Sequence, residues 1–409
     1  MEFINQANNR ELTELVTAAM DLGEQLLICG GEVFRVEDTI RRLCIAYGAK
    51  NVDVFTITSC VILTADFGEK GSISQSRRIA GTGFNLSALD ALNDLSRRAC
   101  SSRMTPAKLR SELDRINEMR KYSYGESCWI WALIASSFSV FFGGNGFDAV
   151  FAGGIGIILY IVQSFFIRME INSYLSIVLC SLLGGFLSNL VLSFFHLPLN
   201  PAMINIGIIM LLIPGIALTN AIRDVFSGDI ISGLLRFSEA LVLSVTIAWG
   251  FAALASPSAL TESINPWVQL TAGILGSLGF SLMFNVRGRR LVWCSVGGGV
   301  AWGMVLLCEM AGGTELMGYF IASVGLTVYA EILARRMRCP VTVFVATATI
   351  PLIPGGSLYR TMRFAMAEEW SSFAMQGLHT LLYAILISVG ILIVMTAVHA
   401  GDVLRGKRQ

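Results

Sequence analysis

The chain has 409 residues, of which 54% are hydrophobic and 14% are charged, and its net charge is +1. A soluble domain carries about 25% charged residues, and the mean hydropathy here is +0.65. Most of the chain is therefore expected to lie in a lipid bilayer. The near-neutral charge gives no compositional support for binding nucleic acid.

Charged residues are concentrated at the start of the chain. About half of the Lys and Arg residues, and about half of the Asp and Glu residues, precede residue 126. This predicts a polar α+β domain over 1–125. The N-terminus has no basic stretch followed by an apolar one, so no cleavable signal is predicted and the domain is expected to stay in the cytoplasm.

The polar domain shows helical and strand patterns in turn. Apolar spacing predicts helices, β-branched and aromatic residues predict strands, and Thr105-Pro106 is typical of a helix start. Gly48 is expected to end the second helix. The predicted elements are helices 12–27 and 36–47, strands 52–57 and 59–67, a short strand near Ile73, and helices starting at Leu86 and Pro106.

Nine cysteines are scattered along the chain, without a C-x-x-C pair or a Cys/His cluster. Their odd number and their position in apolar runs predict reduced thiols that act as small hydrophobic side chains. The sequence predicts no metal site and no cofactor.

Ten apolar segments follow from Cys128 onward, and most reach the roughly 20 residues that cross hydrocarbon. The first is marginal, and the fourth and ninth contain prolines. The segments are 127–143, 147–167, 171–195, 202–222, 230–254, 267–286, 291–311, 315–334, 340–358 and 375–398.

Arginines in the short loops predict the orientation. With the N-terminus inside, nine arginines fall in inner loops and two, Arg360 and Arg363, in the last outer loop. The sequence thus predicts ten spans with both termini in the cytoplasm. The inner-loop arginines are Arg168, Arg223, Arg236, Arg287, Arg289, Arg290, Arg335, Arg336 and Arg338.

A short motif recurs in the fourth and ninth segments. Leu212-Ile-Pro-Gly215 returns as Leu352-Ile-Pro-Gly355, 140 residues and five spans later. Because five is odd, the second copy is expected to cross the membrane in the opposite direction. The predicted fold is therefore an α-helical membrane protein with two inverted five-helix repeats, 126–258 and 259–409, as in many secondary transporters.

Each motif is expected to break its helix near the middle of the bilayer, at Pro214-Gly215 and at Pro354-Gly355. Broken backbone is viable in lipid only where protein or water surrounds it. The half-helices that start near Ile216 and Gly356 would point free N–H groups at a carboxylate. The alternative is a proline kink with no ligand nearby.

Polar residues beyond the breaks are the candidate substrate and proton groups. Thr219, Asn220 and Arg223 follow the first break, and Ser357 and Arg360 follow the second, with Tyr359 between them. The first group suits a substrate ammonium, hydroxyl or carboxylate, although the charged residues can equally cap a helix end at the interface. The candidates for carrying the coupled proton are Asp224, Asp229, Glu239 and Glu331.

Other ionisable residues lie near predicted span ends and are expected to be interfacial. Glu309 and Glu315 are in this class, as are His379 and His399. Glycine-rich stretches are expected to allow close helix packing.

Two motifs resemble the threonine/serine exporter family: Gly30-Gly-Glu-Val-Phe-Arg-Val-Glu37, and Pro214-Gly with Asn220, Arg223-Asp224 and Gly228-Asp229. Residues 1–255 resemble its larger module and 265–400 its smaller one. The resemblance implies an exporter in the bacterial inner membrane, driven by the proton gradient. Its substrate is threonine and serine, or succinate and similar dicarboxylates, and the residues leave both open.

Two other classes of function remain open at this level. One is a passive channel, and the other is a membrane-anchored sensor or enzyme that acts through the N-terminal domain. Arg35 and Glu37 beside a double glycine favour the latter, but a helix cap with an ion pair explains them equally, and the domain has no histidine. The oligomeric state is also open, a homo-oligomer included.

Overall fold

The computed structural model describes residues 2–81, 83–194, 197–212, 215–252 and 264–404. The chain groups into two units. Unit 1 is made of Met1–Lys121 with two short segments, Gly228–Leu235 and Phe284–Val286, and unit 2 is made of the remaining residues.

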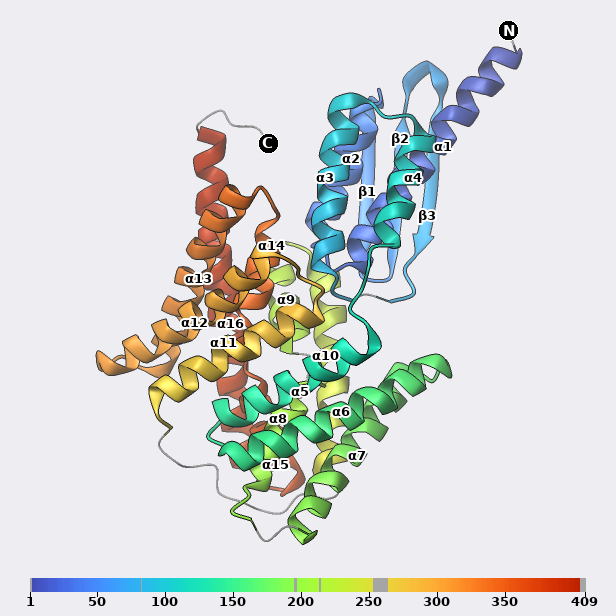
Figure 1. Cartoon of the computed structure of the whole chain (residues 1–409). Coiled ribbons are helices and arrows are strands. Elements are labelled where there is room, and N and C mark those ends of the chain that lie inside the picture. Colours follow the sequence, from blue (N-terminus) through green and yellow to red (C-terminus); the bar gives the residue numbers. More distant parts are fainter. Residues whose placement is uncertain (1, 82, 195–196, 213–214, 253–263, 405–409) are drawn as a thin grey trace. The chain divides into compact units, whose positions relative to one another are not determined.

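Unit 1 is an α+β domain with four helices and one three-stranded sheet among its described residues (Figure 1). The order of elements agrees with the predicted one, and the first helix extends further toward the N-terminus. The elements are α1 (Glu2–Ile28), α2 (Val33–Ala46), β1 (Asn51–Ile57), β2 (Cys60–Asp66), the 3-10 turn η1 (Gly68–Lys70), β3 (Ser72–Arg78), α3 (Leu86–Ser102) and α4 (Pro106–Asn117).

The sheet is antiparallel in the order β1-β2-β3. Successive side chains of a strand point to opposite faces, and in β2 the alternate residues Val61, Leu63 and Ala65 are buried. Helices α1 and α2 pack against the sheet. The predicted strands are confirmed, including the short one near Ile73.

Local capping fixes the helix ends of unit 1. The Thr105 side chain accepts a hydrogen bond from the Lys108 N–H at the start of α4, where Pro106 occupies the first turn. Gly48, after α2, has φ +100°, which is the left-handed conformation expected of a residue after a helix. Both predicted helix boundaries are confirmed.

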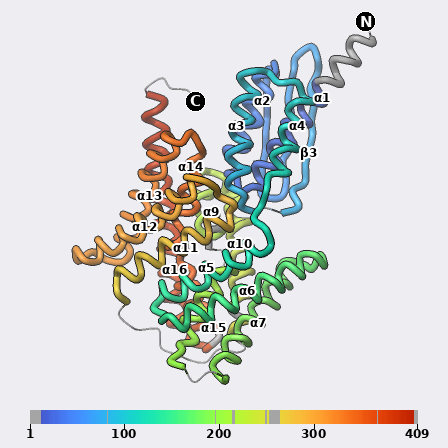
Figure 2. Tube along the Cα trace, viewed as in Figure 1, coloured from blue at the N-terminus to red at the C-terminus, as the bar shows by residue number. Residues whose placement is uncertain are grey.

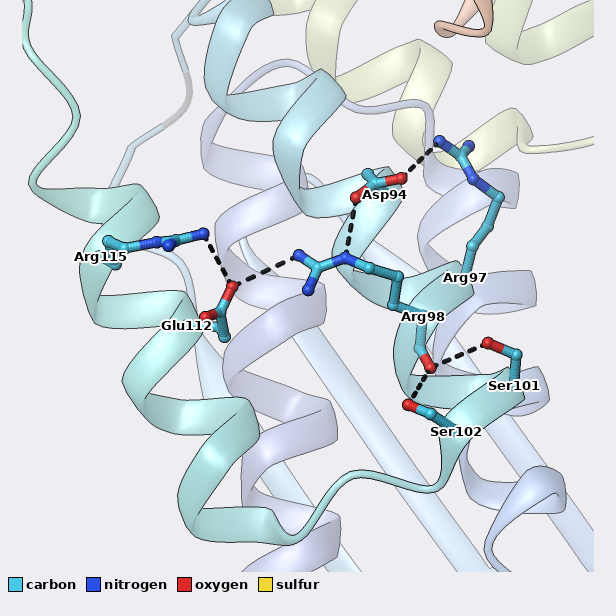
Figure 3. Close-up of polar contacts among 7 residues, drawn as sticks. All are labelled: Asp94, Arg97, Arg98, Ser101, Ser102, Glu112 and Arg115. Carbon is cyan, nitrogen blue, oxygen red and sulfur yellow. Dashed lines mark hydrogen bonds and ion pairs between the residues drawn. The ribbon is translucent and has the colours of Figure 1, made fainter.

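Ion pairs on the surface join α3 to α4 (Figure 3). Arg98 contacts Asp94 at 2.9 Å on its own helix and Glu112 at 3.4 Å on α4, and Arg115 contacts Glu112 at 2.9 Å. Such exposed pairs each contribute little to stability, about 0 to 1 kcal/mol.

Unit 2 is helical throughout its described residues (Figure 2). Its helices follow the ten predicted apolar segments closely. They are α5 (Tyr124–Phe141), α6 (Gly146–Arg168), α7 (Ser173–Phe194), α8 (Pro201–Ile209), α9 (Gly215–Phe226), α10 (Ile230–Ala252), α11 (Pro266–Met283), α12 (Arg289–Met310), α13 (Glu315–Met337), α14 (Val341–Ala348), the 3-10 turn η2 (Ile350–Leu352), α15 (Gly355–Met366) and α16 (Trp370–Leu404).

Six of the described helices are long and apolar enough to cross a membrane: α6, α7, α10, α12, α13 and α16. The bent pair α14/α15 adds a seventh if it forms one span. Helices α5 and α11 have 18 residues each, and α8 and α9 have 9 and 12, fewer than the roughly 20 that cross hydrocarbon. The predicted count of ten spans is therefore not confirmed and stays a prediction.

The helix boundaries of unit 2 recur along the chain. Helices α14, α15 and α16 begin 140 positions after α8, α9 and α10. Helices α11, α12 and α13 likewise follow α5, α6 and α7 at an offset of 142 or 143. The chain thus repeats one series of helices, in which the fourth member is interrupted.

Close contacts between helices recur with the same offset. Gly156 of α6 packs against Ala135 of α5, and Gly298 of α12 packs against Ser277 of α11. In the same way Gly250 of α10 contacts Ser181 of α7, and Gly390 of α16 contacts Ser323 of α13. Such approaches need small residues on both helices. The repeat therefore extends from the motif to the packing.

The turns between helices repeat as well. Residues with positive φ occur in matched pairs: Gly143 and Asn285, Glu170 and Gly312, Gly228 and Glu368. Glycine, asparagine and, less often, other residues adopt this conformation after a helix. The backbone is therefore conserved between the two series even where the residue type differs.

All nine cysteines are free thiols, and five of them are fully buried. This confirms the prediction of reduced cysteines that pack as small hydrophobic side chains.

Candidate functional site at two interrupted helices

The first interruption separates α8 from α9. Helix α8 ends at Ile209, the following turn is described as far as Leu212, and α9 begins at Gly215. Pro214, the predicted break residue, lies outside the described residues. Helix α8 is buried among α5, α6 and α7, so its end is enclosed by protein.

The residues after the first break are buried. Thr219, Arg223 and Asp224 are 5%, 8% and 4% exposed. The Thr219 carbonyl oxygen accepts a hydrogen bond from Ser388 Oγ of α16 at 3.1 Å. Asn220, the remaining candidate here, is half-buried. Three of the four candidates on α9 are thus held inside the protein.

A buried ion pair joins α9 to α10. Asp224 Oδ2 lies 2.8 Å from the Arg236 guanidinium, whose side chain is 14% exposed. The assignment of Arg223 and Arg236 to an inner loop is wrong, because α9 extends to Phe226 and α10 begins at Ile230. Both arginines lie in helices and are used in packing as well as in charge.

The second interruption is a bend of 41° between α14 and α15. The 3-10 turn η2 fills the gap, and Pro354 (φ −76°, ψ 43°) precedes α15 without a side-chain cap in the described structure. Gly355, at the first position of α15, donates its N–H to the Ile353 carbonyl at 2.7 Å. The predicted start of a half-helix near Gly356 is confirmed.

Aromatic side chains and glycines enclose this break. A Cβ on Gly356 would lie 2.6 Å from Phe142, and a Cβ on Gly273 of α11 would lie 3.8 Å from the Pro351 ring. The interrupted backbone is therefore surrounded by protein, as unsatisfied groups in lipid would require.

A chain of hydroxyl and amide groups joins α15 to α16. Ser357 Oγ lies 2.8 Å from Thr380 Oγ1 and accepts a hydrogen bond from Gln376 Nε2 at 2.8 Å. Thr361 Oγ1 lies 3.1 Å from the same Thr380 oxygen. The predicted site residue Ser357 is thus engaged by α16.

The predicted residue Arg360 lies on α15, together with Arg363. Their assignment to the last outer loop is wrong, because α15 continues to Met366 before the turn at Glu368. Tyr359, next to Arg360, packs instead into a buried cluster with Trp131 and residues of α8.

The structure relates the two interrupted spans through shared neighbours. Helix α15 contacts α8, and both α9 and α15 pack against α16. Leu218 of α9 and Ala384 of α16 share one buried cluster with Ala240.

The other proton candidates are placed differently. Glu331 lies 3.8 Å from Arg335 in an i,i+4 pair, and Glu239 is exposed on α10. Asp229 belongs to the segment that groups with unit 1. Among the four candidates, Asp224 is the buried carboxylate.

Glu37 of the N-terminal motif has a structural contact. Its Oε1 accepts the Thr56 N–H at 2.8 Å and so joins α2 to β1. Burial raises the pKa of Glu37, and the charge of Asp229 raises it further. Arg35 pairs with Glu32 at 3.5 Å. These contacts agree with the cap-and-ion-pair interpretation of the motif. In the described part of the chain, no group of three or more His, Cys, Asp or Glu is arranged to hold a metal.

Comparisons with known proteins agree with this architecture. A family model for the threonine/serine exporter matches residues 17–256, and a second model for the threonine/serine exporter matches residues 269–397. The chain belongs to the threonine/serine exporter family.

One relative is a threonine/serine exporter from Corynebacterium glutamicum, which is 21% identical over 392 residues. The match covers 90% of this chain and 78% of the relative. No solved structure matches. The family is one of membrane transporters, so the protein is an exporter that acts on a small molecule across a bilayer.

Sequence reasoning missed several polar residues of the exporter that contact the candidates. Gln376 and Thr380 of α16 and Thr361 of α15 were not singled out, and neither was Arg236 as the partner of Asp224. Spacing was the available signal for α16, because Gln376 and Thr380 are four residues apart and share one helix face.

Proposed function

We propose that the protein is a secondary active exporter of small carboxylate-bearing metabolites, of the threonine and serine type, driven by the proton gradient. The supporting observation is the pair of interrupted helices at matching places in two repeated series, α8/α9 and α14/α15, in a chain of the threonine/serine exporter family. Interrupted helices at a repeat interface are the usual binding sites of secondary transporters.

In this proposal the two series are inverted repeats that together cross the bacterial inner membrane ten times, with both termini in the cytoplasm. Each series contributes five spans, so the second runs in the opposite direction to the first. The recurring boundaries and glycine contacts support the repeat, and the arginine distribution supports the orientation. The helices shorter than a full span would pack within the bundle.

The substrate carboxylate would lie at the breaks, between the starts of α9 and α15. Pro214-Gly215 and Pro354-Gly355 free backbone N–H groups, and the positive end of each half-helix favours an anion. Thr219, Asn220 and Arg223 would line the first half of this site, and Ser357 and Arg360 the second.

Asp224 is our proposed carrier of the coupled proton. It is 4% exposed and lies against Arg236, and a proton on a buried carboxylate changes the charge that the surrounding helices must accommodate. Asp229, Glu239 and Glu331 are the other candidates. Asp224→Asn is expected to uncouple flux from the proton gradient.

Proteoliposomes loaded with radiolabelled threonine or succinate test the proposal. We expect saturable threonine flux that collapses when the proton gradient is removed. Flux of succinate alone would favour the dicarboxylate exporter. Flux that neither saturates nor depends on the gradient would indicate a passive channel and contradict the proposal.

A further inference from the structure

An aromatic cluster lies beside the second interrupted helix, formed by Trp302 of α12, Tyr319 of α13 and Tyr383 of α16. The tyrosine rings stack with centroids 4.5 Å apart, and Trp302 lies 6.4 Å from Tyr319 at an edge. The three side chains are 7%, 8% and 6% exposed. Phe141 adjoins Trp302 at 4.6 Å and connects the cluster to the enclosed break, through Phe142 at 5.2 Å.

Two hydrogen-bond donors at this place lack acceptors. Trp302 Nε1 and Arg360 Nε are both buried, and neither has a partner among the described residues. Arg360 is close enough for its charge to act on both tyrosine hydroxyls. A buried indole N–H normally finds an acceptor, because an unmade hydrogen bond costs about 1 to 3 kcal/mol.

A carboxylate stands on the other side of the tyrosine pair. Glu315 begins α13, and the Tyr383 hydroxyl donates a hydrogen bond to its carboxylate. In the described structure Glu315 and Arg360 form no ion pair with one another, so each charge keeps capacity for a ligand of opposite sign. Glu315 was expected to be only an interfacial residue.

Packing alone explains the ring contacts but not the two donors. A purely structural cluster would place an acceptor near Trp302 or leave Arg360 in an ion pair, because buried polar groups are nearly always satisfied. A ligand with oxygen atoms would satisfy both donors, and a ligand with a cation would suit the tyrosine faces and Glu315.

We propose that Trp302, Tyr319, Tyr383, Glu315 and Arg360 form the subsite that recognises a zwitterionic amino acid. Arg360 binds the substrate carboxylate, and the Trp302 N–H donates to a substrate oxygen. The ammonium group lies against the tyrosine rings and Glu315. This inference rests on the proposed function and specifies its substrate class.

The arrangement discriminates between the two substrate classes that the sequence leaves open. A dicarboxylate would bring its second negative charge toward Glu315 and lose the attraction that an ammonium group gains there. Like charges in such a site are an effective means of rejecting the wrong ligand. The subsite therefore favours an amino acid over succinate.

Substrate analogues combined with variants test the subsite in proteoliposomes that contain the full chain. The probes are threonine, threoninol, which lacks the carboxylate, and 2,3-dihydroxybutyrate, which lacks the ammonium group. Each is measured by half-saturation of threonine counterflow or by its inhibition. Arg360→Gln and Glu315→Gln are expected to raise the half-saturating threonine concentration at least tenfold. Arg363→Gln, one turn further along α15, is the matched control and should stay within twofold.

The analogues separate the two contacts. Arg360→Gln should leave the inhibition by threoninol unchanged, and Glu315→Gln should leave the inhibition by 2,3-dihydroxybutyrate unchanged. Arg360→Lys should recover part of the affinity for threonine. Where an analogue does not inhibit the wild type, the threonine values of the variants and of the Arg363→Gln control decide alone.

Two results would overturn the subsite. One is unchanged threonine saturation in both variants, and the other is an equal loss for every compound that inhibits. Threonine counterflow by the wild type beside either result would leave the proposed export function intact. A wild type without any threonine counterflow would instead contradict the function itself.

Discussion

The two interrupted helices share one backbone plan but carry different side chains. Positions 140 residues apart pair Asn220 with Arg360 and Ala217 with Ser357, while Arg236 is replaced by Gln376. After the first break, the buried charge of Asp224 is matched by Arg236. After the second, Arg360 keeps a buried donor without a partner in the described structure.

This difference indicates a division of labour between repeats. The first half-helix is held by an ion pair and by its contact with Ser388 of α16. The second presents unsatisfied donors beside aromatic rings. Symmetry of the backbone therefore does not require symmetry of the chemistry, and a substrate with two unlike ends is well served by two unlike halves.

Removal of Arg236 is expected to have the largest effect on stability. Arg236→Gln leaves Asp224 as a buried carboxylate without this cation, which costs about 3 to 5 kcal/mol. The melting temperature of the detergent-solubilised chain should fall by several degrees. The double variant Asp224→Asn with Arg236→Gln should recover part of the loss. A double variant as unstable as the single one would show that the charge pair is not the cause.

The glycine contacts compare the two series directly. Gly250→Ala and Gly390→Ala each place a methyl group against the serine of a neighbouring helix, and overpacking of this kind costs about 1 to 3 kcal/mol. We expect similar losses in thermal stability for both, because the contact is the same in each repeat. Gly154→Ala, where the added Cβ meets nothing within 4 Å, is the control. A loss confined to one site would break the equivalence of the repeats.

The hydroxyl chain between α15 and α16 gives a smaller effect. Thr380→Val removes the group that contacts both Ser357 and Thr361, at a cost of about 1 kcal/mol. Urea or thermal unfolding of the solubilised chain measures it. Thr271→Val on α11, whose hydroxyl bonds only to its own helix, is the control. Equal effects of the two substitutions would show that the chain of hydroxyls between the helices contributes nothing.

The sequence predicted what depends on local order. Helix starts such as Thr105-Pro106, the strands of the small sheet and the interruption before Gly355 follow from residues close together in the chain. Charge counting misplaced Arg236 and Arg360, because it treats an arginine near a helix end as a loop residue, whereas arginine can extend its charge along a helix.

Contacts over long distances in the sequence could not be predicted. Ser388 reaches Thr219 across 169 positions, and the ring stack of Tyr319 with Tyr383 depends on how α13 and α16 pack. Neither tyrosine carries a motif, so no local pattern singled them out. The aromatic subsite is visible only once the helices are packed.

The central claim is that the substrate is held where the two helices are interrupted. Its most direct test is threonine counterflow in proteoliposomes with Pro214→Ala or Pro354→Ala, which return a backbone donor and favour a continuous helix. Pro266→Ala, at the start of α11, is the matched control. We predict that counterflow falls at least tenfold in both break variants at equal membrane insertion and is unchanged in the control. Normal counterflow in both break variants would contradict the account.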